Sequence, residues 1–284
     1  MAWWSWGNPD ASHVVVCVHG LTRQGRDFDR LAQALLERAG DQVHVLCPDV
    51  AGRGQSDWLP RSALYQIPQY AADMLALLAQ CHGCRPIERL DWVGTSMGGL
   101  IGMALAGQPG LPLPAPMRRL VLNDVGPSIT WASVQRMQQY VGLYGRFAHL
   151  AEAAAELRRL SLGFGPVPDA LWLEMSGHMV RPCPEGGLTL HYDPAIGEPL
   201  RALTPEAAQA AEAVVWGLYD QIRAEVLLIR GQESDLLTED TARSMTLRGP
   251  KAQLVQWPGV GHAPTLTDPA HTRVVADFLL APAA

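Results

Sequence analysis

The stretch from Leu90 to Leu100 constrains this chain more than any other, because it places Ser96 between Gly94 and Gly98. A short apolar run precedes the motif and predicts a strand, while the glycines and alanines after it predict a helix that packs closely on a sheet. So sharp a turn strains the central serine, and only residues without side chains fit two positions before and after it. The pattern also occurs in loops with two turn glycines, but the flanking strand and helix favour a nucleophile elbow that pushes the serine hydroxyl beyond the sheet.

Composition excludes several classes of protein. With 284 residues, 48% of them hydrophobic, the chain can bury the core of one domain, or of one domain with an inserted subdomain. A net charge of -6 without a basic stripe argues against nucleic acid or an anionic membrane as partner. The N-terminus lacks the pattern of a signal peptide, and no apolar run reaches the length of a membrane span.

The cysteines indicate a reducing compartment. There are five, an odd number, and Cys17 and Cys47 fall in predicted buried strands. Cys81 and Cys84 form a Cys-x-x-Cys pair at the end of a helix, where two unrelated cysteines are the favoured interpretation. We therefore expect a cytoplasmic protein.

Buried apolar runs alternate with helical patterns over most of the chain. A strand buried on both faces needs a continuous apolar run, and strands separated by helices form a mostly parallel, doubly wound sheet covered on both faces. The fold class is therefore α/β. The expected strands lie near residues 2–6, 14–18, 43–47, 90–93, 120–122, 226–229 and 254–257, and the expected helices near 27–39, 67–81, 98–107, 239–245 and 269–280.

The alternation stops between residues 126 and 221, where helical patterns and loops occur without a convincing buried strand. We expect this segment to be an inserted helical subdomain, and residues 1–125 and 222–284 to form the main domain. Helices are expected near residues 132–141, 147–160, 170–179 and 205–219.

Three residue types at the ends of the strands predict nucleophilic catalysis. Ligands bind at the carboxyl ends of the strands of a parallel sheet. A serine hydroxyl needs an imidazole to take its proton, and the imidazole needs an acid to fix its tautomer. Ser96, His262 and Asp235 supply these roles in the chain order serine, acid, histidine.

The acid has more than one candidate. Asp235 follows the penultimate predicted strand by a few residues, and Asp124 ends the strand before the insertion, so either could approach His262. We favour Asp235. Glu233 and Asp240 are lesser candidates, for which a solvated loop charge is the simpler interpretation.

Backbone N–H groups must stabilise the oxyanion that forms when serine attacks a carbonyl. Met97, directly after the nucleophile at a helix N-terminus, supplies one. Leu21 is the candidate for the second, because Gly20 lets its loop fold close to the elbow. We expect His19 to brace this loop by hydrogen bonding.

Cofactor and metal sites are not expected. The stretch Gly52-Arg53-Gly54 follows a strand but lacks the remaining residues of a dinucleotide or phosphate-binding loop. His178 and His191 lie in the insertion without the spacing of metal ligands.

Aromatic residues of the insertion have two interpretations. Trp131, Trp172 and Trp216, with Met175 and Met179, fit the core of the insertion, but any that face the sheet would line an apolar substrate pocket. We retain the three tryptophans as candidate substrate-binding residues.

Together these motifs resemble the α/β-hydrolase fold superfamily with a helical cap, over essentially the whole chain. The resemblance implies Ser96 as nucleophile, His262 as base, Asp235 as acid, and Leu21 and Met97 as oxyanion donors. It implies a small-molecule substrate, and we expect hydrolysis of a small to medium, largely apolar carboxylic ester or lactone through an acyl-enzyme. The alternatives are C–C bond hydrolysis of ring-cleavage products and a noncatalytic ligand receptor on the same fold, and neither acyl chain length nor oligomeric state is determined. The residues that carry the resemblance are His19-Gly20, the loop from Asp49 to Ser56, the elbow from Gly94 to Gly99, Asp235 and Gly261-His262.

Overall fold

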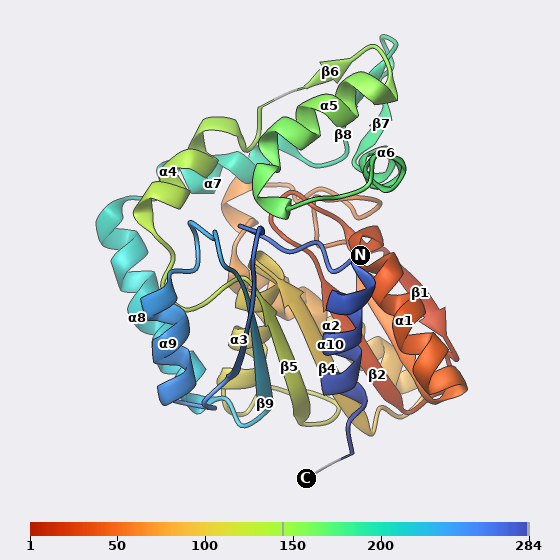
Figure 1. Ribbon diagram of the computed structural model, residues 1–284, viewed down its shortest axis with the longest axis vertical. Coiled ribbons are helices and arrows are strands. Elements are labelled where there is room, and N and C mark those ends of the chain that lie inside the picture. Colours follow the sequence, from red (N-terminus) through yellow and green to blue (C-terminus); the bar gives the residue numbers. More distant parts are fainter. Residues whose placement is uncertain (144, 283–284) are drawn as a thin grey trace.

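A seven-stranded sheet forms the centre of the protein in the computed structural model, which describes residues 1–143 and 145–282 (Figure 1). The strand order is β1-β3-β2-β4-β5-β9-β10, and all neighbours are parallel except β1 and β3. The predicted α/β class with a mostly parallel sheet is confirmed. The strands are β1 (Trp3–Gly7), β2 (His13–Val18), β3 (His44–Pro48), β4 (Arg89–Thr95), β5 (Met117–Asn123), β9 (Glu225–Gly231) and β10 (Gln253–Trp257).

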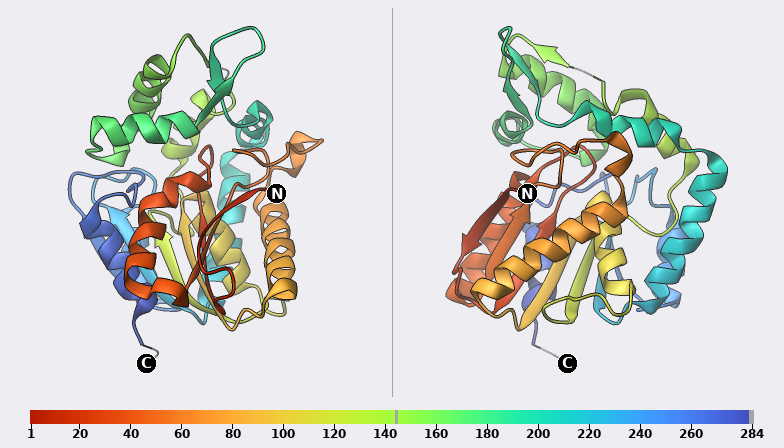
Figure 2. Two further views of the ribbon diagram at one scale, coloured as in Figure 1. Left: turned by 90° about the vertical axis from the view of Figure 1, so that its right-hand side faces the viewer. Right: turned by 180° about the vertical axis from the view of Figure 1, so that it is seen from behind.

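Helices cover both faces of the sheet. Two of them, α1 and α10, pack together on one face, and four cover the other, where α3 packs between α2 and α8 (Figures 1 and 2). Two separate apolar layers result, one on each face. Among the described residues, no helix has the length and apolarity to cross a membrane. These helices are α1 (Asp29–Ala39), α2 (Ile67–Cys84), α3 (Met97–Gly107), α8 (Pro205–Gln221), α9 (Glu239–Leu247) and α10 (Pro269–Leu280).

The segment between β5 and β9 lies over the carboxyl ends of the strands (Figure 2). It is not purely helical, because three short strands, β6, β8 and β7, form a small antiparallel sheet in it. Its last helix, α8, returns to the main sheet and packs along α3. The elements above the sheet are α4 (Trp131–Tyr140), β6 (Arg146–Phe147), α5 (Leu150–Leu160), α6 (Asp169–His178), β7 (Val180–Pro182), β8 (Leu188–Leu190) and α7 (Gly197–Ala202).

The strand register brings the reactive segments to one edge of the sheet. Val18 at the end of β2 pairs with Gly94 in β4, and Thr95 pairs with Asn123 at the end of β5. The residues after these strands therefore emerge side by side. β2 is buried along its whole length, as its apolar run predicted.

Glycines let α3 begin directly against the sheet. A Cβ at Gly98 would lie 2.0 Å from the Val18 carbonyl oxygen, and one at Gly94 would lie 2.3 Å from the Gly98 oxygen. Both obstacles are backbone atoms, which cannot rotate away as a side chain can. The two glycines of the elbow are thus required by packing as well as by the turn.

We expect Gly98→Ala to lower the free energy of unfolding by about 1–3 kcal/mol or more, because the added methyl group overpacks backbone against backbone. Gly83→Ala is the matched control, since Gly83 is exposed in α2 and a Cβ there meets nothing within 4 Å. It should stabilise the protein by up to about 1 kcal/mol. Urea unfolding of both variants measures the difference, and equal effects would contradict the packing argument.

Candidate active site

Ser96 occupies the predicted strained turn between β4 and α3. Its backbone has φ 51° and ψ −116°, and it directly precedes the first residue of α3. Its N–H donates to the Asn123 carbonyl oxygen at 3.0 Å, which fixes the turn to the neighbouring strand. The side-chain oxygen lies 3.0 Å from Nε2 of His262.

The second ring nitrogen of His262 identifies the tautomer. Nδ1 lies 2.8 Å from Oδ2 of Asp124, a carboxylate oxygen that accepts, so Nδ1 carries the proton. Nε2 is then free to accept the proton of the Ser96 hydroxyl. Serine, imidazole and carboxylate thus form one continuous chain of hydrogen bonds.

Asp124 is fully buried at the end of β5, with φ 54°. Its Oδ1 accepts from the Gly231 N–H at 2.8 Å, and its Oδ2 accepts from the Ser234 hydroxyl at 2.6 Å. These donors compensate for the loss of water around the charge, because a buried carboxylate is tolerated only when it is hydrogen bonded. The carboxylate is therefore held in one orientation toward His262.

The structure places Asp124, and not the favoured Asp235, beside His262. Asp235 is turned outward, and its half-exposed carboxylate pairs with Arg136 of α4 through two hydrogen bonds of 2.9 Å. The loop after β9 instead presents the preceding residue, Ser234, to Asp124. The two lesser candidates, Glu233 and Asp240, are also absent from the hydrogen bonds of His262 in the described part of the chain.

A local signal separates the two aspartates in retrospect. Asp124 directly follows the buried end of β5, whereas three polar residues, Gln232 to Ser234, separate Asp235 from the end of β9. Residues directly at the carboxyl ends of the strands are the ones that meet at the edge of a parallel sheet.

The histidine loop is held from two directions. The Asn123 amide donates to the Pro264 carbonyl oxygen at 2.8 Å and to the Thr95 hydroxyl at 2.9 Å, so it ties the loop to the elbow. From above, the Gly163 carbonyl oxygen accepts from the Gly261 N–H at 2.7 Å. Asn123 was not singled out from the sequence, where it appears as an ordinary strand end.

His19 braces the turn that follows β2. Its Nδ1 donates to the Gly20 carbonyl oxygen at 2.7 Å, and its Nε2 accepts from the Val50 N–H at 2.9 Å. Burial lowers the pKa of His19 to about 3, so the ring is neutral at ordinary pH and suits this bridging role. A Cβ at Gly20 would lie only 3.7 Å from the Ser96 Cβ, which brings the turn, and with it Leu21, beside the elbow.

Arg53 is the second support of this turn and was not recognised as one from the sequence. It is fully buried, and its Nε donates to the Leu21 carbonyl oxygen at 2.8 Å. Its remaining donors reach the Ala51 oxygen at 2.7 Å, the Tyr70 hydroxyl at 2.9 Å and the sulfur of Met97 at 3.4 Å. Burial lowers the pKa of the Arg53 guanidinium, opposed by Tyr70.

A cavity of about 1130 Å³ opens above Ser96 and His262. Its floor comes from strand-end loops and includes Gly20 and Leu21, and its roof comes from α4, α5, α6 and the short strands. The roof side chains are largely apolar, with charged residues among them. The apolar lining includes Phe28, Met137, Val141, Leu143, Phe147, Leu157, Phe164, Met175, Met179 and Leu190.

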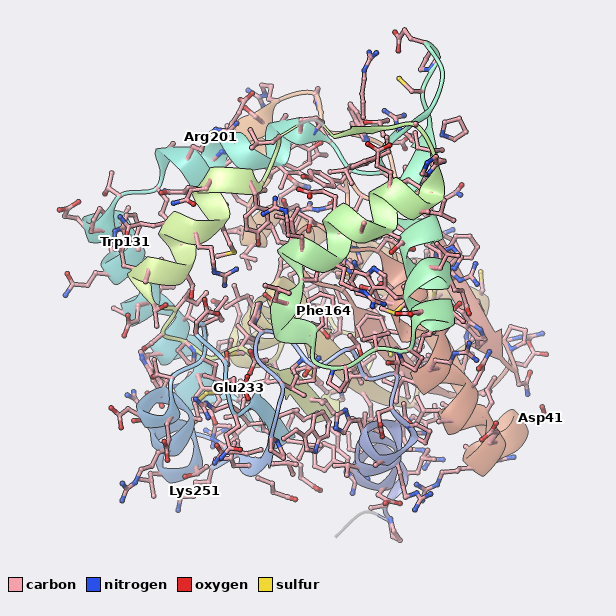
Figure 3. The ribbon with its side chains drawn as sticks, turned by 45° about the horizontal axis from the view of Figure 1, so that its top comes forward. Asp41, Trp131, Phe164, Arg201, Glu233 and Lys251 are labelled. Atoms are coloured by element: carbon pink, nitrogen blue, oxygen red, sulfur yellow. The ribbon has the colours of Figure 1, made fainter. Side chains whose placement is uncertain are left out.

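The three candidate tryptophans do not line this cavity. Trp172 is buried inside the segment above the sheet, where its indole N–H donates to the Ala154 oxygen at 2.7 Å and its ring packs edge-on behind Phe164. Trp216 lies on α8 and packs on Tyr219 and under Arg248. Figure 3 shows Trp131 at the start of α4, toward the rim of the view, and Phe164 near its middle. The structure therefore places Trp172 in the core of the inserted segment, which was the other interpretation of these residues.

His178 has two acidic neighbours. Its ring nitrogen, a carboxylate oxygen of Asp29 and one of Glu174 lie within 4.8 Å of one another. Both acids already have arginine partners, since Asp29 pairs with Arg26 at 2.6 Å and Glu174 with Arg30 at 3.1 Å. The Arg30–Glu174 pair joins α1 to α6, whereas Nε2 of His178 is buried without a hydrogen-bond partner among the described residues.

Comparisons with known proteins bear on the fold and the family. The sequence profile of the Alpha/beta hydrolase family matches residues 15–276. The chain is 45% identical to the 3-hydroxybutyrate-oligomer hydrolase of Cupriavidus necator, over 98% of this chain and 92% of that protein. Among solved structures, an alpha/beta hydrolase of Novosphingobium aromaticivorans is 34% identical, with a TM-score of 0.80 and coverage of 98% and 92%. A Rickettsia typhi protein shares the fold at a TM-score of 0.84 with 24% identity, covering 99% and 91%.

Exchanging each aspartate for asparagine tests which one acts on His262. We expect Asp124→Asn to lower kcat on the order of 10⁴-fold, by analogy with serine proteases, because an amide disfavours the tautomer that accepts the serine proton. Asp235→Asn is the matched control and should change kcat less than tenfold, since it removes one exposed ion pair. Steady-state kinetics on a p-nitrophenyl ester measures both. A larger loss for Asp235→Asn would overturn the geometric assignment.

The buried His19 should make folding sensitive to acid. Because its folded pKa lies below the ordinary value of about 6.5, only the unfolded chain takes up a proton as the pH falls from 7 toward 4. The free energy of unfolding then decreases by up to about 1.4 kcal/mol per pH unit through this group. We expect His19→Asn to be less stable at pH 7 but to lose less stability between pH 7 and pH 5.

Urea unfolding at pH 7, 6 and 5 measures the slope. His149→Asn is the control for replacing an exposed histidine, because asparagine can also cap α5 where the His149 Nδ1 accepts from the Glu152 N–H at 3.2 Å, and its slope is the reference for His19→Asn. The same slope in His19→Asn as in the wild type would contradict the assignment of a neutral buried ring.

Proposed function

We propose that this chain, which belongs to the alpha/beta hydrolase family, hydrolyses short ester-linked oligomers of a hydroxy acid such as 3-hydroxybutyrate. Family membership and ester hydrolysis follow from the profile match over residues 15–276 and from the relative that is 45% identical over 98% of the chain. The substrate class is proposed from the similarity to that relative. The match covers 92% of the relative's length and so includes the segment over the site.

The hydrogen-bonded chain of Ser96, His262 and Asp124 supports an acyl-enzyme mechanism. His262 Nε2 takes the hydroxyl proton as the serine oxygen attacks the ester carbonyl. The resulting imidazolium is stabilised by the Asp124 carboxylate. His262 then donates the proton to the departing alkoxide, which leaves as the free hydroxyl end of a hydroxy acid. Water, activated by the same imidazole, attacks the acyl-enzyme and releases the second product.

The oxyanion would be stabilised by two backbone donors. Met97 opens α3, where N–H groups lack partners within the helix. Leu21 lines the cavity in the turn that His19 and Arg53 hold. Their roles as the two donors are part of this proposal, supported by the closeness of Gly20 to Ser96.

The cavity suits a substrate of more than one unit. Its volume of about 1130 Å³ exceeds the 300–1,000 Å³ of common small-molecule sites. Because α4, α5 and α6 provide most of its apolar wall, we propose that this part of the inserted segment acts as a cap and selects the acyl group.

We expect Ser96→Ala to lower kcat on the linear dimer and trimer of 3-hydroxybutyrate by on the order of 10⁴-fold or more, because covalent catalysis has no substitute nucleophile. Alkali uptake at constant pH follows the hydrolysis, and urea unfolding checks that the fold is retained. A serine-directed phosphonate should add to Ser96, as seen by mass spectrometry of peptides. Turnover by the variant within tenfold of wild type would refute the mechanism. A wild-type enzyme that cleaves p-nitrophenyl esters but neither oligomer would refute the substrate class.

A further inference from the structure

One buried cation faces the cavity close to the nucleophile. Arg23 lines the cavity, and its side chain is only 10% exposed. We infer that Arg23 binds the free carboxylate of the oligoester, so that the enzyme removes hydroxy acid units one at a time from the carboxyl end. This inference rests on the proposed function and specifies which end of the substrate the site holds.

Neighbouring side chains fix the guanidinium of Arg23 in place. Its Nε and Nη2 donate to the two carboxylate oxygens of Asp27, each at 2.6 Å. The ring of Phe164 lies below it, 5.4 Å from the guanidinium carbon. A guanidinium held by a bidentate pair and an aromatic face is preorganised, so it loses little entropy when it binds a ligand.

The remaining amino group of Arg23 is available. Within the described residues, Nη1 donates to no acceptor, and Arg23 belongs to the lining of the cavity. Since Nε and Nη2 already donate to Asp27, Nη1 is the guanidinium nitrogen that would donate to a ligand carboxylate. Its donor strength benefits from the low exposure of the site, because charges interact more strongly away from water.

Other arginines of the cavity are less suited to this task. Arg136, Arg146 and Arg159 also line it, but their side chains are 41%, 67% and 67% exposed. Each is paired with an acid at the surface. Exposed pairs contribute little free energy.

The position of Arg23 fits the length of one substrate unit. A Cβ at Gly20 would lie 3.7 Å from Cγ of Arg23 and 3.7 Å from Cβ of Ser96, so these two side-chain atoms lie at most 7.4 Å apart. In a 3-hydroxybutyrate ester, four bonds separate the attacked carbonyl carbon from the next carboxyl carbon, about 5 Å at bond lengths of roughly 1.5 Å. On this inference, a carboxylate at the end of that unit meets the guanidinium, which extends beyond this Cγ along the lining of the cavity.

The chemistry of the oligomer determines the direction of cleavage. In every ester bond of such a chain, the alkoxy oxygen belongs to the unit nearer the carboxyl end. The free carboxylate is accordingly always part of the leaving group, never of the acyl group held on Ser96. A cation one unit from the nucleophile thus favours release of the terminal monomer, with the rest of the chain extending into the apolar cavity.

The test compares the 3-hydroxybutyrate dimer as the free acid with its methyl ester, which removes the carboxylate but keeps the scissile bond. We expect the wild type to prefer the free acid in kcat/KM. Arg23→Gln combined with Asp27→Asn should lower the ratio of acid to methyl ester by about 10- to 100-fold, mainly through KM, as for loss of a hydrogen bond to a charged group. Arg23→Lys should restore part of the preference. Arg136→Gln, which alters a more exposed arginine of the same cavity, should keep the wild-type ratio.

Four results would overturn the inference. These are a wild type that shows no preference for the acid, a ratio unchanged in the Arg23 variant, a ratio that falls in Arg136→Gln instead, and release of monomer from the hydroxyl end of an end-labelled trimer. The wild-type measurements decide the case even if the Arg23 variant fails to fold. A wild type that cleaves p-nitrophenyl esters but neither dimer would refute the proposed function as well, whereas cleavage of both dimers without preference refutes only the carboxylate site.

Discussion

Close contact between the start of α3 and the backbone of the sheet is the constraint on which the site depends. At Gly98 this contact leaves no room for a Cβ beside the Val18 oxygen, so the backbone of the first helical turn lies directly against the backbone at the end of β2. Ser96 must then take its positive φ, and its side chain can only point away from the sheet. The same closeness places the turn after β2 beside the elbow, because β2 and β4 are paired neighbours. One packing contact thus positions both the nucleophile and the turn that carries Leu21.

Buried charge is compensated differently on the two sides of Ser96. On the acid side, Asp124 receives hydrogen bonds from a backbone N–H, a hydroxyl and the imidazole, so its charge is directed at the residue that becomes cationic in the proposed mechanism. On the other side, Arg53 is buried with carbonyl oxygens, a phenol and a sulfur as partners. None of the hydrogen-bond partners of Arg53 among the described residues is a carboxylate. In the proposed mechanism, the field of this positive charge behind the turn would favour an oxyanion in front of it.

Local sequence pattern was sufficient for the main fold and for two of the three residues in the hydrogen-bonded chain. Continuous apolar runs predicted the strands because a central parallel strand is buried on both faces, and the elbow glycines located Ser96. His262 followed from its place in a loop after the last strand. The strands β6, β7 and β8 escaped detection because each has two or three residues and none alternates over a length that a pattern can register.

Interactions between distant segments decided what the sequence left open. Asp235 points outward because Arg136 captures it across 99 positions of chain, and no feature of its own loop encodes that partner. The direction of Trp172 likewise depends on where α6 packs against α5. Both errors concern the direction in which a side chain points, and tertiary contacts determine that direction. The helix or loop that carries the side chain is determined by local sequence and was predicted.

The loop after β3 extends this dependence to the segment over the site. Its backbone pairs with that segment directly, since the Gly54 N–H donates to the His191 oxygen at 3.0 Å and the Asp193 N–H donates to the Gly52 oxygen at 2.8 Å. Asp193 also accepts from the Tyr65 hydroxyl at 2.5 Å. Between these contacts lies Arg53, whose guanidinium holds the Leu21 carbonyl. The segment over the site and the turn that carries Leu21 are therefore both attached to the same short loop, in which Arg53 also forms an antiparallel bridge with Tyr192. The geometry of the turn and the shape of the cavity are in this way set together, although the residues that form them lie more than a hundred positions apart in the chain.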